Sequence, residues 1–122
     1  MNFQGVKAPE VPKGVQQYRP VTDYMTHEVI SFTPEQSIAD AMDVFLDKHI
    51  SGAPVIDEKG KIIGILSEID CMRIMVDEAY HNLHHGKITV AEYMSNNVAT
   101  VSVDMDVLDC AQKFLRTHYR RF

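Results

Sequence analysis

The chain has 122 residues, of which 45% are hydrophobic and 24% are charged, and its formal net charge is −5. This length suits one ordinary domain or two very small ones, with a core that is stable without disulfide cross-links. No stretch is apolar over the roughly eighteen residues that a membrane-spanning helix requires, and no basic face is visible before the tail. We therefore expect neither membrane insertion nor nucleic-acid binding.

The first 17 residues contain two prolines and two glycines and little periodicity, which indicates a leader or an extended arm. This segment lacks the hydrophobic region of a signal peptide. Cys71 and Cys110 lie in apolar periodic stretches instead of a closely spaced framework, so we expect core thiols, with a single disulfide as the alternative. Together these features favour a cytoplasmic protein.

An internal repeat organises the rest of the chain. A shift of 69 positions lays residues 21–53 on residues 90–122 without a gap. The identical pairs are Val21/Val90, Tyr24/Tyr93, Met25/Met94, Val29/Val98, Asp40/Asp109, Phe45/Phe114, Leu46/Leu115 and His49/His118.

In the first copy the pattern predicts elements in the order β-α-β-β-α. Residues rich in β-branched side chains predict strands at 29–32, 53–56 and 62–66, the last two joined by a turn that contains Gly60. Apolar residues at helical spacing predict a helix that opens at Thr33-Pro34-Glu35 and ends at Ser51-Gly52, and a second one through Ile69 to Val76.

The second copy offers a strand at 98–101 and a helix at 107–116 and then stops at Phe122. By the logic of the repeat, two strands and a closing helix are missing. We expect either a fragment or a shortened protein that a second chain completes.

The sequence resembles the CBS domain, a small repeat named after cystathionine β-synthase. The resemblance rests on the Tyr-Met pair before each first strand, on SGAPVID at 51–57 and on GILSEID at 64–70. It implies an α/β fold of tandem CBS repeats, with small mixed sheets flanked by helices. Residues 18–86 would form the first repeat with a linker helix, and residues 87–122 a partial second repeat. In many relatives the clefts of such a pair, a Bateman module, bind AMP, ADP, ATP or S-adenosylmethionine.

Ser67 and Asp70 allow two interpretations. They can form a capping box at the start of a helix, which many proteins have without any ligand. The same helix start can also bind a phosphate through its N–H groups and the Ser67 hydroxyl, while the Asp70 carboxylate accepts hydrogen bonds from ribose hydroxyls. Gly64 in the preceding strand allows a flat group or another backbone to approach closely. With the resemblance included, we expect the pair to do both.

The resemblance also implies the rest of two clefts. In the first, Ile65, Ser67 and Asp70 would face the second repeat, with Ser51 and Gly52 near the phosphates; the facing residues would be Val98, Tyr119 and Arg120. The second cleft would lack its own Ser and Asp, and its residues would be Thr26, Val29, Ile50 and Ser51, with Arg120 and Arg121 reaching phosphate. A solvated tail is the alternative role for the two arginines. We expect at most one competent adenosine site per chain, unless a second chain completes the other cleft.

Other clusters have simpler explanations. His81, His84 and His85 could hold a metal, but no Cys or carboxylate completes the set at close spacing, so a solvated helix end is favoured. We expect no metal site and no required cofactor, and no motif argues for catalysis. The function expected is regulatory sensing of an adenosine-containing ligand by a homodimer, with an unknown effector. The alternatives are a dimerisation module with empty clefts and, least favoured, a small enzyme.

Overall fold

The computed structural model describes residues 18–81 and 87–122, which form two compact units. Unit 2 comprises residues 26–100, and unit 1 combines residues 18–25 with residues 101–122. The expected leader at 1–17 and the side chains of the histidine cluster at 81–85 lie outside the described part of the chain.

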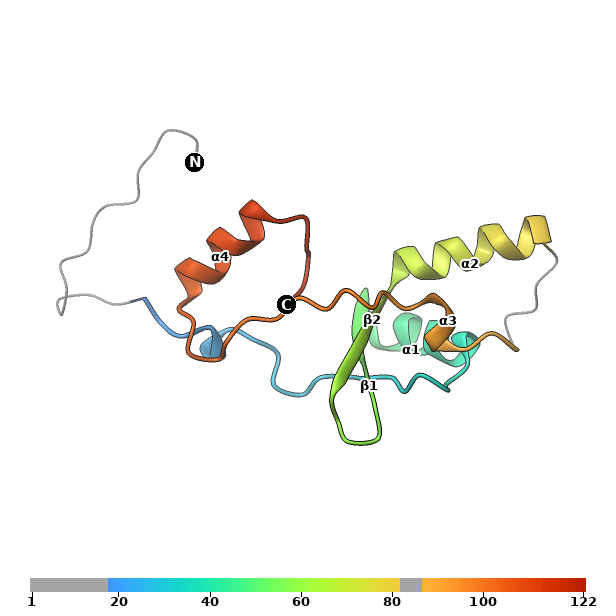
Figure 1. The fold of residues 1–122 in the computed structure, drawn as a ribbon, viewed down its shortest axis with the longest axis horizontal. Coiled ribbons are helices and arrows are strands. Elements are labelled where there is room, and N and C mark those ends of the chain that lie inside the picture. The colour runs from blue at the N-terminus through green and yellow to red at the C-terminus, as the bar shows by residue number, and fades with distance from the viewer. Residues whose placement is uncertain (1–17, 82–86) are drawn as a thin grey trace. The chain divides into compact units, whose positions relative to one another are not determined.

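Unit 2 is built on an antiparallel hairpin of β1 (Gly52–Ile56) and β2 (Ile62–Ser67) (Figure 1). Val55 lies opposite Gly64, and alternate residues of both strands are buried. The predicted turn between the strands is confirmed: Gly60 has a φ of 79°, and Asp57 Oδ1 accepts hydrogen bonds of 2.9 Å from the N–H groups of Lys59 and Lys61. The left-handed conformation is one that glycine adopts without steric cost.

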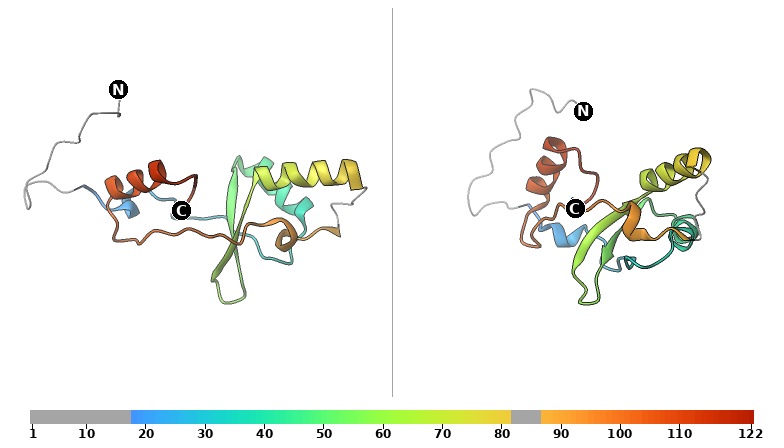
Figure 2. Two further views of the ribbon diagram at one scale, coloured as in Figure 1. Left: turned by 45° about the horizontal axis from the view of Figure 1, so that its top comes forward. Right: turned by 45° about the vertical axis from the view of Figure 1, so that its right-hand side comes forward.

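Three helices lie on the same side of this hairpin: α1 (Ile38–Lys48), α2 (Glu68–His81) and the short α3 (Val90–Tyr93) (Figure 2). Their apolar sides and the buried face of the hairpin make one core. Its residues are Phe32, Ile38, Ala41, Phe45, Ala53, Val55, Leu66, Cys71, Ile74, Ile88 and Val90. The expected α/β class, with a small sheet flanked by helices, is confirmed.

Both outer edges of the hairpin are occupied by single-residue bridges. The predicted strand at 29–32 is wrong, because only Phe32 pairs, with Val55: its N–H donates to Pro54 O (2.9 Å) and its carbonyl accepts from Ile56 N–H (2.8 Å). Two residues earlier, the same parallel pattern would need an N–H at position 54 to bond the carbonyl of residue 30, and Pro54 has none. At the other edge, Ile65 and Ser95 exchange hydrogen bonds of 2.9 and 2.8 Å.

The bounds of α1 differ from the prediction at both ends. The helix begins at Ile38 and not at 33–35, because Ser37 Oγ accepts a 3.1 Å hydrogen bond from Asp40 N–H and caps it there. It ends at Lys48 and not at 51–52, because His49 adopts a left-handed conformation with a φ of 55°. A left-handed residue after the last turn is a common helix stop.

Unit 1 contains the predicted helix at 107–116, α4 (Val107–Arg116), and a 3₁₀ turn, η1 (Val21–Asp23). Asp106 caps α4 by accepting a 2.8 Å hydrogen bond from Asp109 N–H. The predicted strand at 98–101 is wrong, since these residues are neither strand nor helix. A strand exists through pairing with a neighbour, and β-branched residues alone do not supply one.

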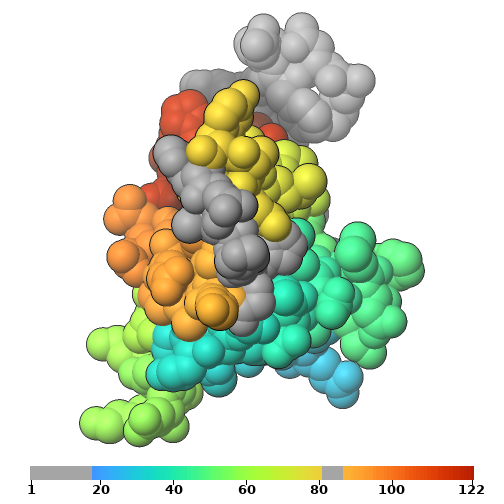
Figure 3. Space-filling model, turned by 90° about the vertical axis from the view of Figure 1, so that its right-hand side faces the viewer, coloured from blue at the N-terminus to red at the C-terminus, as the bar shows by residue number. Residues whose placement is uncertain are grey.

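The contacts confirm the repeat at its 69-residue offset. Ser37 bridges Thr89 in unit 2, and the equivalent Asp106 bridges Pro20 in unit 1. Each helix start is therefore paired with the segment that leads into the other repeat, and this exchange explains why the units cut across the repeats. Figure 3 shows the result for unit 2, where residues 87–100 (orange) lie against residues 33–40 (cyan).

Candidate adenosine-binding site

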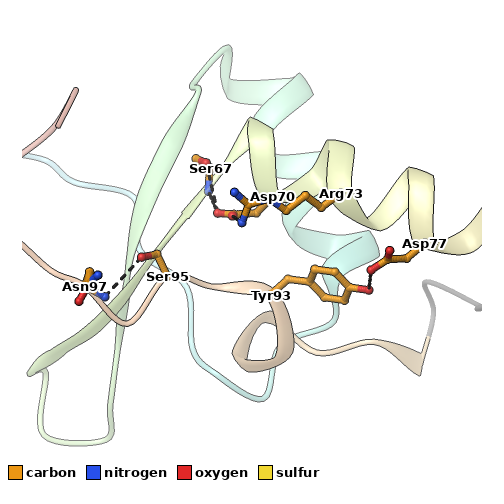
Figure 4. A network of polar contacts seen from close by, with 7 residues as sticks. All are labelled: Ser67, Asp70, Arg73, Asp77, Tyr93, Ser95 and Asn97. Carbon is orange, nitrogen blue, oxygen red and sulfur yellow. Dashed lines mark hydrogen bonds and ion pairs between the residues drawn. The ribbon is translucent and has the colours of Figure 1, made fainter. Parts of the chain in front are cut away.

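The junction of β2 and α2 places the predicted Ser67 and Asp70 in direct contact. Asp70 is buried, with 5% of its surface exposed. Its Oδ2 accepts hydrogen bonds from Ser67 N–H (2.8 Å) and from Ser67 Oγ (3.2 Å) (Figure 4). The bond from the backbone N–H is the acid's half of the predicted capping box. The Ser67 hydroxyl donates to Asp70 instead of capping the Asp70 N–H, so the structure bears out this half of the motif.

Ser51 and Gly52 lie beside this junction. Gly52 pairs with Ser67 across the hairpin, and the Ser51 carbonyl accepts a 3.0 Å hydrogen bond from Glu68 N–H. The N–H groups of Ser67 and Glu68 are therefore engaged within the protein. The expectation of unpaired N–H groups for a phosphate is wrong at these two positions.

Gly64 is explained by the close approach of another backbone. A Cβ at this position would lie 2.5 Å from Met94 Sδ and 3.0 Å from Ser95 O. The next residue, Ile65, forms an antiparallel bridge with Ser95, so the first residues of the second repeat run along β2 in the direction opposite to that strand, away from the Ser67–Asp70 junction. The sequence predicts that either a flat group or another backbone approaches Gly64. In the structure it is the backbone of Ser95.

Charge at the start of α2 is mainly negative. Glu68 and Asp70 both lie in its first turn. Arg73, one turn further along, approaches Asp70 with 3.5 Å between Nη1 and Oδ1, and its side chain is 69% exposed. A phosphate at this helix start would meet two carboxylates and one guanidinium.

Two groups on α2 or in contact with it have raised pKa values. A 2.6 Å hydrogen bond from the Tyr93 hydroxyl to Asp77 Oδ2 raises the pKa of Tyr93 to about 12, with burial and the negative charge of Asp77 adding to the effect. Burial, followed by the charges of Asp70 and Glu68, raises the pKa of Cys71 to about 11. Cys71 is a buried free thiol and belongs to the core, as the sequence predicts.

The structure thus brings together six predicted residues: Ile65, Gly64, Ser67, Asp70, Ser51 and Gly52. Val98 is half-buried three residues after Ser95, and Ile50 packs against the core. Thr26 and Val29 are exposed in unit 2. Tyr119, Arg120 and Arg121 belong to unit 1.

Sequence reasoning missed Arg73, Tyr93 and Asp77 as part of this polar network. Arg73 could have been found, because a spacing of three residues on a helix places it beside Asp70. The Tyr93–Asp77 contact joins residues 16 positions apart and needed the path of the chain between them.

Comparison with known proteins assigns the family. The CBS domain family matches residues 21–77 and 90–122, and the chain belongs to it. The uncharacterized protein MJ1225 of Methanocaldococcus jannaschii is 26% identical over 102 residues, which are 84% of this chain and 35% of that protein. The chain therefore spans about a third of the length of this relative.

Two similar solved structures hold adenosine compounds. One is CBSX2 from Arabidopsis thaliana in complex with AMP, with a TM-score of 0.69 and 25% identity over 84% of this chain and 78% of that one. The other is the CBS domain pair of protein MJ0100 in complex with 5′-methylthioadenosine and S-adenosyl-L-methionine, with a TM-score of 0.69 and 25% identity over 86% of each chain. No described helix is long and apolar enough to cross a membrane, and the described residues contain no cluster of potential metal ligands.

Proposed function

We propose that the chain is a non-catalytic regulatory module that binds an adenosine-containing ligand at the Ser67–Asp70 junction. The observation that carries this proposal is the buried Asp70 carboxylate at the start of α2, beside Ser51 and Ser67 and next to the chain that leads into the second repeat. A carboxylate accepts hydrogen bonds only and suits the paired hydroxyls of a ribose. The adenosine compounds in two similar CBS structures support this ligand class.

The ligand would act on the equilibrium between arrangements of the module. It can shift that equilibrium only as far as its affinities for the two arrangements differ. The roles of Val98, Tyr119, Arg120 and Arg121 at this ligand, and of Thr26, Val29 and Ile50 in a second cleft, stay predictions from the sequence.

Thermal unfolding with AMP, ATP and S-adenosylmethionine tests the proposal. A ligand at 100 times its Kd should add about 2.7 kcal/mol of stability to the wild-type protein. Asp70→Asn should remove this gain, because an amide cannot serve both hydroxyls as acceptor, while its oxygen still accepts from Ser67 N–H and preserves the fold. Asp43→Asn, at an exposed position of α1, is the matched control and should keep the gain. An equal response of both variants would place the ligand elsewhere.

A second function, self-association, is favoured by the exposed face of α2. Ile69, Met72, Met75, Val76 and Tyr80 are 47% to 81% exposed along this helix. Exposed apolar surface of this kind often marks an interaction site. We propose a homodimer through this face, and sedimentation velocity over a range of concentrations tests it. Met72→Lys/Met75→Lys should abolish association, whereas Leu46→Lys on α1 should not; an unchanged dimer in the double variant would contradict the proposal.

A further inference from the structure

The two oxygens of Asp70 have different partners. Oδ2 accepts both hydrogen bonds from Ser67, of which the one from the backbone N–H is the shorter. Within residues 18–81 and 87–122, the contact of Oδ1 is a long ion pair, 3.5 Å from Arg73 Nη1 (Figure 4). A carboxylate has about four lone-pair sites, so Oδ1 is the oxygen that a ligand can reach at the lower cost.

A ligand hydroxyl at Oδ1 would displace Arg73. The Arg73 side chain is 69% exposed, and an exposed ion pair of this kind contributes little to stability. The Ser67 bonds, by contrast, hold the backbone at the start of α2. Binding would therefore exchange the partner of Arg73 and leave the cap intact.

The released guanidinium would remain at the same end of the helix. Side chains on a helix point back toward its N-terminus, so Arg73 covers the turn that contains Asp70. Between Glu68 and Tyr80 it is the only Lys or Arg, against the acids Glu68, Asp70, Asp77 and Glu78. Asp77, one turn further along, already accepts from Tyr93. An anionic group bound at this end of α2 has Arg73 as its counter-charge on the helix.

We propose that Arg73 determines the charge class of the ligand by exchanging the Asp70 carboxylate for a ligand phosphate. This inference rests on the proposed function. A phosphorylated adenosine ligand supplies both the hydroxyls that displace Arg73 and the oxygens that receive it, in a charge-assisted hydrogen bond. Uncharged adenosine displaces Arg73 without offering a new partner. The site therefore selects nucleotides over nucleosides.

Isothermal titration of the full chain with AMP and with adenosine tests the proposal. In Arg73→Gln the affinity for AMP should fall about tenfold or more, in line with the loss of a charged hydrogen bond, while the affinity for adenosine stays level or rises a few-fold. Arg73→Lys should restore part of the preference for AMP. Lys59→Gln, in the β1–β2 turn, removes the same charge away from the junction and should change neither affinity.

The outcomes separate this proposal from the one it rests on. If the wild-type protein binds neither compound, the proposed function fails and the role of Arg73 fails with it. If both compounds bind and Asp70→Asn abolishes binding, but Arg73→Gln changes the two affinities equally or leaves both unchanged, the adenosine site stands and the role of Arg73 is overturned.

Discussion

The hydroxyl of Tyr93 donates a 2.6 Å hydrogen bond to Asp77 Oδ2 and so joins α3, at the start of the second repeat, to the second half of α2. This contact lies on the same helix as the Ser67–Asp70 junction and on the segment that continues to Ser95 (Figure 4). It connects the orientation of α2 to the path of the chain along β2.

The Tyr93–Asp77 contact predicts a late tyrosine titration. The pKa of Tyr93 is raised to about 12 from an ordinary value of 10.0, so the folded protein holds this proton more tightly than the unfolded chain. The stabilisation is therefore complete below pH 10 and is lost as the pH rises toward 12. Absorbance of the five tyrosines against pH should show one late ionisation that Tyr93→Phe removes and Tyr80→Phe retains. An identical titration in wild type and Tyr93→Phe would contradict the assignment.

Gly64→Ala should destabilise the protein by about 1–3 kcal/mol, because the new methyl group would overlap Met94 Sδ and press on the Ser95 carbonyl. Chemical denaturation measures the loss. Met94→Ala should relieve part of the overlap, so that the double variant is more stable than the sum of the two single effects implies.

Gly60→Ala is the matched control for this cycle. Nothing lies within 4 Å of its added Cβ, and its cost comes from the positive φ of 79° alone. The changes in unfolding free energy caused by Met94→Ala and Gly60→Ala should therefore be additive. Strict additivity in the Gly64 cycle would show that the close approach of Met94 is not what requires glycine there.

Cys71 should react slowly with thiol reagents in the native protein. A pKa of about 11 against an ordinary 9.0 lowers its thiolate fraction at mildly alkaline pH by on the order of a hundredfold, and the side chain is buried. Labelling should reach two equivalents only in denaturant, since Cys110 is buried as well. Comparison with Cys71→Ser assigns the signal, and fast labelling that this variant loses would contradict the expectation.

Loss of either helix cap should cost about 1 kcal/mol, and the two losses should be similar because the caps are equivalent in the repeat. Ser37→Ala removes the acceptor of Asp40 N–H, and Asp106→Ala that of Asp109 N–H. Both variants are compared by urea denaturation. Asp104→Ala, two residues before the second cap, serves as control and should cost less; an equal cost would show that the cap is not the cause.

The sequence was sufficient to predict what depends on local patterns. The hairpin, its Gly60 turn and α4 lie where apolar periodicity and turn residues place them, and the repeat offset correctly pairs Ser37 with Asp106. The start of α1 was misjudged, since Thr33 and Ser37 are both suitable caps and the contact of residues 36–38 with residues 88–90 decides between them.

The features that the sequence did not predict depend on pairing between residues far apart in the chain. The failure of residues 29–32 and 98–101 to form strands follows from what lies beside them, which periodicity does not report. At the candidate site the Ser67–Asp70 contact was predictable from a three-residue spacing. Contacts with distant parts of the chain, such as that of Ser95 with Ile65, were not predictable. They depend on the path of residues 87–95 past α1 and β2.

The one-residue bridges at the hairpin edges also limit how copies of this chain could join. Phe32 engages the backbone of β1 on both sides of Val55, and Ser95 engages that of β2 at Ile65, so neither strand presents a long run of open backbone groups. Growth of a continuous intermolecular sheet, the usual start of fibril formation, would first require one of these bridges to be broken.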